Sequence, residues 1–406
     1  MEEKRLEEIM RVVQEEDVEF IRLQFTDMSG SLKNIAITAD QLLRVFVNPF
    51  PIEEREPDGK RRKLYLLPDL DTFAILPWRP QTGKVARFLC DIVDDAGESW
   101  ENSSREILRK VVRQAKKEGY TFFVKPECEF FLFHTDENGL PTSLTHERAG
   151  YLDVSPIDLG ENARRDMVLA LKEMGLPVES SHHEVGPGQH EIDIQETTAF
   201  QAADRIVTMR MAVRAIAKRH GLHATFMPKP KTGVEGSGMH MQIELWKDGK
   251  NVFEDEKLQE AFMAGIANRI EETAVFANPT VNSYRRLREN SHLTDNPVIQ
   301  VKTWKALKDR AAVEVQTADG TANPYVLLAL FLEAGLLGLR KGEKKKALSF
   351  PRNLGVAIEK AEKKDFARTV LGKKFVKEYL TARKEEWDSY ERQVTAWETE
   401  AYLHRM

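Results

Sequence analysis

The sequence predicts an α+β protein in which a small N-terminal β domain precedes a larger domain built on an antiparallel sheet and helices. Strand-like segments dominate the N-terminal quarter, whereas later segments alternate between strand and helix patterns. A chain of 406 residues, 41% of them hydrophobic, is long enough to bury two cores. Ser103 is a suitable N-cap before a periodic helical segment, so we expect domains at 1–102 and 103–406.

The N-terminal segment begins with a charged amphipathic helix, followed by strands that are separated by turn residues. Segment 48–62 is rich in proline and charge, so we expect a loop there. The predicted elements of this domain are a helix at 2–16 and strands at 18–26, 32–38, 63–67 and 85–92.

The larger domain begins with a helix at 105–118, whose apolar residues recur at helical spacing. Strands are predicted at 121–133, 178–185, 189–194, 239–246 and 311–317. Helices are predicted at 162–174, 200–219, 256–274, 324–340 and 372–396.

The composition argues against nucleic-acid-binding, disulfide-rich and membrane-spanning classes of protein. The chain carries 60 Lys and Arg against 65 Asp and Glu, a net charge of −5, so a nucleic-acid partner is not expected. Two cysteines give no disulfide framework and fit a reducing cytoplasm. No apolar run approaches the roughly 20 residues of a membrane span, and the charged start is not a signal peptide.

Several acidic side chains lie within apolar strands. Glu127 and Glu129 are two residues apart in PECEFFLF, and a strand places them on one face. Glu314 lies in a third apolar strand, AAVEVQ, and His240 begins another, in GSGMHMQIEL.

The segment SHHEVGPGQHEIDI has the pattern of a hairpin with a Gly-Pro-Gly turn. If Pro187 and Gly188 form a two-residue loop, Glu184 and Glu191 lie opposite each other across the hairpin. Like charges in such a position destabilise a sheet unless a cation lies between them.

Any one of these glutamates could be the polar side of a half-exposed strand. Together they predict a metal site, because buried carboxylates are costly without a cation. Oxygen-rich ligands with one imidazole favour Mg²⁺ or Mn²⁺ over zinc.

At this point the chain resembles type I glutamine synthetase nearly from end to end. Three segments resemble the β-grasp domain of that family: FIRLQFTDMSGSLKN, YLLPDLDTFAILPW and KVARFLCDI. Others resemble its catalytic domain: PECEFFLF, SHHEVGPGQHEID, HGLHATFMPKP, GSGMH, NPTVNSYRRL, ANPYV and EWDSYERQV. The resemblance implies the glutamine synthetase fold, ATP as a cofactor and a role in nitrogen metabolism.

The resemblance also implies a two-cation site. Its ligands would be Glu129, Glu184 and Glu191 for one metal, and Glu127, His240 and Glu314 for the other. Arg286 matches an arginine that binds the substrate glutamate, and Gly236 matches a backbone position beside it. The family forms stacked six-membered rings, which implies a homo-oligomer, either a hexameric ring or a dodecamer.

The sequence departs from the family at positions that bind nucleotide and substrate. Gln316, Ala312 and Gln300 stand where the family has arginines, and Glu235 stands where it has asparagine. Gln cannot supply the charge with which guanidinium groups grip carboxylate and phosphoryl oxygens.

Two further elements of the family are absent. Segment 48–62 replaces a loop that supplies an Asp to the neighbouring subunit, and the stretch between Leu287 and Asn323 lacks the glutamate-bearing flap. Four basic residues just upstream of Glu314 either compensate or form a solvated loop: Lys302, Lys305, Lys308 and Arg310.

Three functions therefore remain open. The first is an ATP-dependent carboxylate–amine ligase for glutamate or a relative, with normal glutamine synthesis weak or lost. The second is a metal-binding pseudoenzyme that regulates, or assembles with, an active glutamine synthetase. The third is another phosphoryl-transfer enzyme on the same fold.

Overall fold

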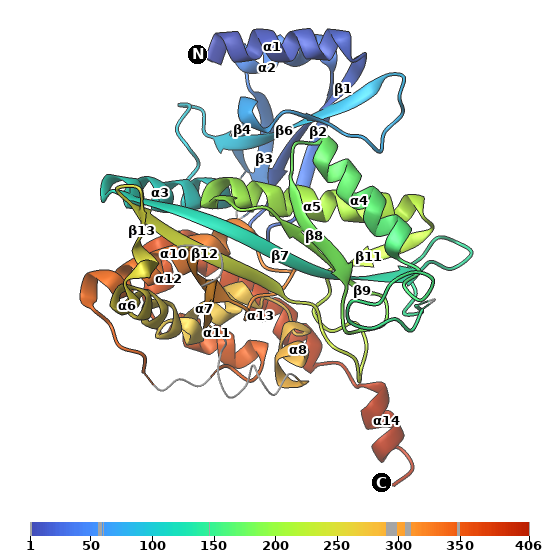
Figure 1. Ribbon diagram of the computed structural model, residues 1–406, viewed down its shortest axis with the longest axis vertical. Helices are drawn as coiled ribbons and strands as arrows, with labels where there is room; N and C mark the ends of the chain where they lie inside the picture. Colours follow the sequence, from blue (N-terminus) through green and yellow to red (C-terminus); the bar gives the residue numbers. More distant parts are fainter. Residues whose placement is uncertain are drawn as a thin grey trace.

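The computed structural model contains a small N-terminal sheet at one end of a larger body, with helix α14 projecting from the opposite end (Figure 1). The described residues are 2–55, 59, 61–145, 147–289, 299–304, 310–346 and 350–405.

The N-terminal sheet has the strand order β2-β1-β6-β4-β3, with β5 also paired to β6. Strands β1 and β6 run parallel, and the other pairs are antiparallel. Alternate apolar residues of β1, including Ile21 and Leu23, pack with Ile9 and Val13 of helix α1 in a separate small core. The elements are α1 (Glu2–Glu15), β1 (Val18–Thr26), β2 (Leu32–Thr38), α2 (Leu42–Val47), β3 (Phe50–Arg55), β4 (Arg61–Pro68), β5 (Ala74–Ile75) and β6 (Lys84–Val93).

The expectation of a loop at 48–62 is wrong for much of that segment. Strand β3 pairs antiparallel with β4, so a hairpin arm replaces the loop. Ile52 lies opposite the buried Leu64, which gives the arm an apolar contact. Pro51 is tolerated because β3 is the edge strand of the sheet, where a missing N–H leaves no ladder bond unmade.

The second sheet has the order β14-β15-β12-β7-β9-β8, and every adjacent pair is antiparallel. Short strands extend it, because β10 and β11 pair with β7 and β13 pairs with β12. The strands are β7 (Tyr120–His134), β8 (Val178–His183), β9 (Gln189–Ile194), β10 (Thr197–Thr198), β11 (Leu222–Thr225), β12 (Met239–Lys247), β13 (Lys250–Asn251), β14 (Ile299–Trp304) and β15 (Arg310–Val315).

Helices build the core against this sheet. Helices α3 and α5 pack on β7, and α10 packs on α3, α5 and α6. Val124, Cys128 and Phe130 of β7 point into that core, so Glu127 and Glu129 lie on the other face. The helices are α3 (Ser104–Lys117), α4 (Glu161–Glu173), α5 (Ala199–Arg219), α6 (Glu256–Ala267), α7 (Ile270–Ala277), α8 (Ser283–Glu289), α10 (Pro324–Lys341), α11 (Leu354–Glu362), α12 (Phe366–Leu371), α13 (Lys373–Glu391) and α14 (Ala396–Tyr402).

Two predicted helices are each divided in the structure. The segment 256–274 falls in α6 and α7, which are separated by Asn268 and Arg269. The segment 372–396 ends as α13 at Glu391, and α14 then starts with a capping box between Thr395 and Glu398. Periodicity continued across both breaks, so it could not reveal them.

The division at residues 102 and 103 stays a prediction. Ser103 is the residue before α3, although its side chain makes no capping hydrogen bond with the described residues of that helix. Ala74, Leu76 and Val85 belong to the first segment of sequence but pack in the large core. The two sheets are therefore joined by shared apolar packing.

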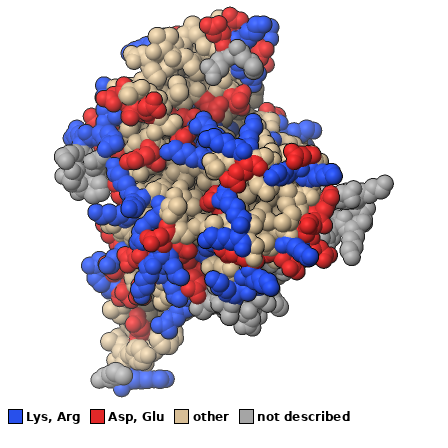
Figure 2. All heavy atoms as spheres, turned by 90° about the vertical axis from the view of Figure 1, so that its left-hand side faces the viewer, with Lys and Arg blue, Asp and Glu red and all other residues tan. Residues whose placement is uncertain are grey.

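Acidic and basic side chains are interspersed over the face shown in Figure 2. Among the described helices, none is both long enough and apolar enough to cross a bilayer.

Candidate metal centre

The candidate site is built around β7, an inner strand of the second sheet. Glu127 lies opposite His240 of β12 on one side and opposite Asp193 of β9 on the other. Glu129 lies opposite Glu191 of β9. Antiparallel pairing thus places acidic groups from separate parts of the sequence on one polar face.

One predicted ligand set is brought together as a compact triad. His240 Nδ1 lies 3.7 Å from Glu127 Oε2 and 3.8 Å from Glu314 Oε1. One ligand atom from each of the three residues falls within 4.8 Å of the others. Glu314 is fully buried and Glu127 nearly so, which makes their negative charge costly without a cation.

A second triad lies at the β8–β9 hairpin. Glu184 and Glu191 come together there with His182, within the same 4.8 Å limit. His182 Nδ1 is 3.6 Å from Glu184 Oε1, and its Nε2 is 3.8 Å from Glu191 Oε1.

The expected hairpin register is wrong. His182, not Glu184, lies opposite Glu191, and the Glu184 N–H donates to the Gln189 carbonyl at 2.8 Å. The connecting loop is therefore longer than two residues, because Glu184 pairs with Gln189 and residues 185–188 lie between them. Within this loop the Gln189 N–H donates to the Gly186 carbonyl, and the Gly186 N–H donates to Gln189 Oε1. Glu184 and Glu191 still share a face, but as diagonal neighbours.

Glu129 lies between the two triads. Its Oε1 is 3.7 Å from His240 Nε2. Its Oε2 accepts hydrogen bonds of 2.9 Å from Gln189 Nε2 and from the Gly238 N–H. These donors fix one carboxylate oxygen and leave the other beside the imidazole.

The crowding of carboxylates raises the pKa values of groups in the site. Burial and the neighbouring Glu129 raise the pKa of Glu184 to about 7. Burial, with Glu129 and Asp193 beside it, raises the pKa of Glu191 well above its usual value. Burial alone would lower the pKa of His240, but the Glu127 and Glu129 carboxylates raise it. Negative charges that lie close together with little solvent favour protonation, and this raises the pKa values of the groups.

The predicted substrate residues lie beside the first triad. The buried Arg286 donates to the carbonyls of Thr317 at 3.1 Å and Gln316 at 2.9 Å. A Cβ on Gly236 would lie 2.9 Å from Arg286 Cγ, and one on Gly238 would lie 2.7 Å from Arg286 Nη2. The two glycines thus leave the space that the guanidinium fills.

The three positions where arginines are replaced lie on β15, which carries Glu314, directly after it, or on the neighbouring β14. Ala312 is buried on β15, and Gln316 directly follows that strand. Gln300 of β14 is opposite Glu314 in the backbone register.

The four upstream basic residues are only partly described. Lys302 is opposite Ala312 on β14, and Arg310 begins β15. Lys305 and Lys308 lie outside the described residues.

Sequence reasoning missed three polar residues on this face. His182 completes the second triad, Asp193 lies opposite Glu127, and Gln242 Nε2 donates to Glu127 Oε1. Each is two residues from a predicted ligand, in the same strand or, for His182 and Glu184, at the end of one, so strand alternation was a signal that could have found them.

A buried network holds the hairpin from its other face. His183 Nε2 lies 2.6 Å from Glu147 Oε1, and its Nδ1 lies 2.6 Å from the Glu184 carbonyl. Arg164 bridges Asp158 at 2.7 Å and His190 Nδ1 at 2.9 Å. These acidic groups already have cationic or hydrogen-bonding partners, so the network fits a structural role.

Comparison with known proteins identifies the family. The glutamine synthetase catalytic-domain model matches residues 101–402, and the glutamine synthetase β-Grasp model matches residues 17–95. The chain belongs to the glutamine synthetase family. This family of ATP-dependent ligases agrees with the resemblance seen in the sequence.

Relatives in the family cover nearly the whole chain. A glutamine synthetase of Clostridium saccharobutylicum is 42% identical, and one of Staphylococcus aureus (strain Mu50) is 38% identical; both alignments cover 98% of each chain. The first alignment has 436 positions, 30 more than the 406 residues of this chain, so the relative holds segments that this chain lacks.

Solved structures confirm the fold. A structure titled "Apo GmaS without ligand" has a TM-score of 0.86 at 24% identity and covers 97% of this chain and 99% of its own. A glutamine synthetase of Plasmodium falciparum has a TM-score of 0.85 at 20% identity and covers 97% and 98%. The predicted β-grasp domain followed by a catalytic domain with an antiparallel sheet is confirmed.

Proposed function

We propose that this chain is an ATP-dependent carboxylate–amine ligase for glutamate or a related acid, in which ordinary glutamine formation is weak or lost. The observation that carries the proposal is one polar face with two triads, each of two carboxylates and one imidazole, with Glu129 beside His240 of one and opposite Glu191 of the other. This face lies next to positions where arginines are replaced. Family membership supports the ligase class, and the replacements Gln316, Ala312 and Gln300 support a changed task.

The donor set fits two divalent cations. In the proposal Glu129, Glu184 and Glu191 hold one, and Glu127, His240 and Glu314 hold the other. Carboxylate oxygens with one imidazole suit Mg²⁺ or Mn²⁺. The raised pKa values of Glu184 and Glu191 support this fit, because a cation would compensate the charge that raises them. When bound, the cations would neutralise phosphoryl oxygens.

The chain's own residues would orient the substrate. Arg286 is held by the carbonyls of Gln316 and Thr317, with its cation beside the Glu129 and His240 side of the site. Its Nε has no hydrogen-bond partner among the described residues. We propose that Arg286 grips the acid substrate and that Gly236 keeps the backbone close to it.

The replaced arginines would weaken transition-state binding. Removing one charged contact of this kind typically costs about 3–4 kcal/mol in the barrier. Ala312 carries no charge, and Gln316 can offer only neutral hydrogen bonds. A nucleotide remains part of the proposal, because a similar structure, 25% identical with a TM-score of 0.85, is titled "GmaS/ADP complex-Conformation 1".

Phosphate release from ATP tests the proposal, with Mg²⁺ or Mn²⁺ and a panel of glutamate-like acids and amines. We expect acid- and amine-dependent release with at least one pair, and glutamine formation far below that of an ordinary glutamine synthetase assayed beside it. Glutamine turnover within about tenfold of that control would contradict the loss of ordinary activity. Metal binding without any phosphate release would favour a pseudoenzyme that regulates or joins an active glutamine synthetase.

We also propose a cytoplasmic homo-oligomer, a hexameric ring or a dodecamer. Support comes from the retained β-grasp segment and from α14, which projects from the body (Figure 1) and leaves Trp397, and Leu403 just after the helix, exposed. Light scattering should give a mass several times the 46.5 kDa of one chain. A monomer would contradict the proposal.

A further inference from the structure

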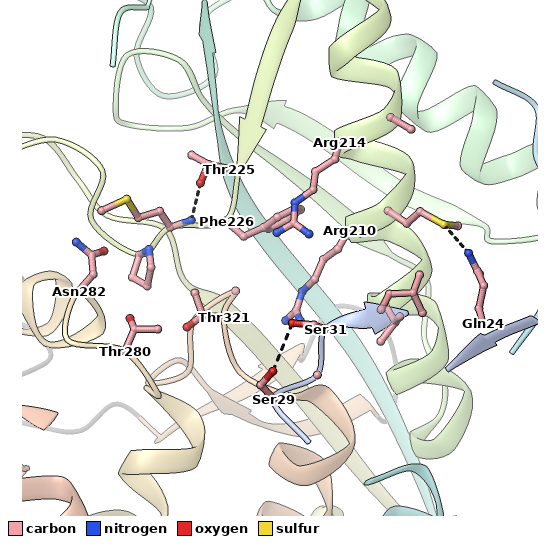
Figure 3. Close-up of a pocket in the computed structure, with 18 of the residues that line it drawn as sticks. Gln24, Ser29, Ser31, Arg210, Arg214, Thr225, Phe226, Thr280, Asn282 and Thr321 are labelled. Atoms are coloured by element: carbon pink, nitrogen blue, oxygen red, sulfur yellow. Dashed lines mark hydrogen bonds between the residues drawn. The ribbon is translucent and has the colours of Figure 1, made fainter. Parts of the chain in front are cut away.

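A cavity of about 820 Å³ lies away from the carboxylate triads, between helix α5 and the turn that joins β1 to β2 (Figure 3). Ser29 and Ser31 of the turn line one side, and Thr280 and Asn282 line another. This volume is in the range of small-molecule sites, and it far exceeds that of a water or a single ion.

The cavity is on the opposite face of the catalytic sheet from the metal centre. Arg210, which lines it, contacts Met239 Sδ at 3.1 Å, whereas the next residue, His240, points to the triads. Phe226 of the cavity wall packs on Phe130, which alternates with Glu129. A ligand here would therefore not touch the proposed cations.

Two arginines one helical turn apart supply positive charge. Arg210 and Arg214 extend from α5 into the space, and Figure 3 shows them facing the side that carries Thr280 and Asn282. Arg214 is exposed, and its guanidinium lies 5.1 Å from the centre of the Phe226 ring. The described residues that line the cavity include no Asp or Glu.

Arg210 has an unusual environment for a cation. It is 8% exposed, and among the described residues it makes no ion pair with a carboxylate. Its Nη1 donates to the Ala322 carbonyl at 3.0 Å, and its Nε has no hydrogen-bond partner within the described part of the chain. Burial disfavours the charged guanidinium and lowers the pKa of Arg210 to about 10. A bound anion would offset this cost of burying the charge.

Two acidic residues close in sequence to lining residues are already engaged. Asp27 accepts from the N–H groups of Ser29 and Ser31 at 3.0 and 2.9 Å, and Asp319 accepts from Thr321 and Asn278. Guanidinium groups bind carboxylate and phosphate oxygens, and the hydroxyl groups of the wall supply further donors for such an anion. Met211 and Leu32 add apolar surface for the body of a ligand.

We propose that this cavity is a second ligand site, which binds a small organic anion carrying a phosphate or carboxylate group through Arg210 and Arg214. The cavity lies where the turn between β1 and β2 of the N-terminal sheet meets the larger part of the chain. A Cβ on Gly30 of the turn would lie 2.7 Å from Asn323 Cα, and Asn323 Nδ2 donates to the Met28 carbonyl at 3.1 Å. An anion held between the turn and α5 stabilises this junction.

Calorimetry on the full chain, freed of metal by a chelator, tests the site. The probes are inorganic phosphate, glycerol 3-phosphate and citrate, with glycerol as the uncharged control. We expect saturable binding of at least one anion and none of glycerol. Arg214→Gln should weaken that binding about tenfold or more, because a hydrogen bond to a charged group is lost.

Two control variants distinguish this cavity from the exposed surface of α5 and from the metal centre. Lys218→Gln removes an exposed charge from the same helix outside the cavity and should leave anion affinity unchanged. Glu127→Gln alters the metal centre and should also leave it unchanged. The two oxyanion classes are distinguished by whether citrate or glycerol 3-phosphate binds more tightly.

Three results would overturn the proposal. One is that no anion binds the wild type at about 10 mM. Another is equal affinity in the wild type, Arg214→Gln and a folded Arg210→Met. The third is a loss of anion binding in Glu127→Gln as large as in Arg214→Gln, which would place the anion at the metal centre.

Discussion

Glu129 of β7 and Glu191 of β9 lie directly opposite each other on antiparallel strands, with both side chains buried. Such a like-charged pair destabilises a sheet. It persists here on a face where two triads of possible metal ligands meet. The pair therefore links the stability of the metal-free protein to the proposed metal binding.

Removing one of these charges should act in opposite directions on stability and on metal affinity. We expect Glu129→Gln to stabilise the metal-free protein by up to about 1 kcal/mol, because the repulsion across the strands is relieved. The same change should weaken Mn²⁺ binding by tenfold or more, on the order of 1.4 kcal/mol. Urea unfolding with a chelator and Mn²⁺ calorimetry measure the two effects.

Glu260→Gln, on the exposed side of α6, should change neither. Unaltered Mn²⁺ affinity in Glu129→Gln would exclude Glu129 as a ligand.

The pH dependence of stability should reflect Glu184. Its pKa is raised from 4.5 to about 7 in the folded protein, so between these values the folded state holds the extra proton. Stability of the metal-free protein should then fall as pH rises from 4.5 to about 7, on the order of 1 kcal/mol for this group after allowing for solvent screening. Urea unfolding across this range measures it.

Glu184→Gln should flatten this pH dependence. His183 and His240 have raised pKa values as well and contribute a loss in the same direction, so the comparison with the variant isolates the carboxyl. Saturating Mn²⁺ should reverse the trend, because the metal binds the ionised form. The interpretation fails if wild type and Glu184→Gln have the same slope.

The space beside Arg286 should not tolerate a side chain. In Gly238→Ala the new Cβ would lie 2.7 Å from Arg286 Nη2 and 3.1 Å from His240 Nε2. We expect the arginine and the imidazole to move, with a fall of about tenfold or more in Mn²⁺ affinity and in any ligase activity. Gly150→Ala is a matched control, because among the described residues its Cβ would meet only Asp153 Oδ2, at 3.8 Å. Equal Mn²⁺ affinities in the two variants would contradict this prediction.

Helices α6 and α10 cross closely at two glycines. A Cβ on Gly338 would lie 2.1 Å from the Ala261 carbonyl, and one on Gly265 would lie 2.2 Å from the Ala334 carbonyl. Gly338→Ala should therefore destabilise the protein by about 1–3 kcal/mol through overpacking, although alanine favours helix elsewhere. Thermal unfolding beside Ser389→Ala, an exposed position on α13, measures the difference. An unchanged midpoint in Gly338→Ala would show that the helices separate easily.

The sequence by itself determined the fold class, the family and most strand positions. Strand alternation placed Glu127 and Glu129 on one face, because successive side chains of a strand point to opposite sides. Long family motifs then carried the resemblance that the comparisons confirmed. These conclusions depend on local pattern alone, and local pattern is fully present in the sequence.

Only the tertiary structure decided which groups meet. The register of the hairpin placed His182 opposite Glu191, since it depends on how Gln189 closes the loop. Segment 48–62 became a hairpin arm because Ile52 could pair with the buried Leu64 at a sheet edge. The cavity of Arg210 arises where α5 meets a turn distant in sequence, and burial against distant residues has no signal in local periodicity.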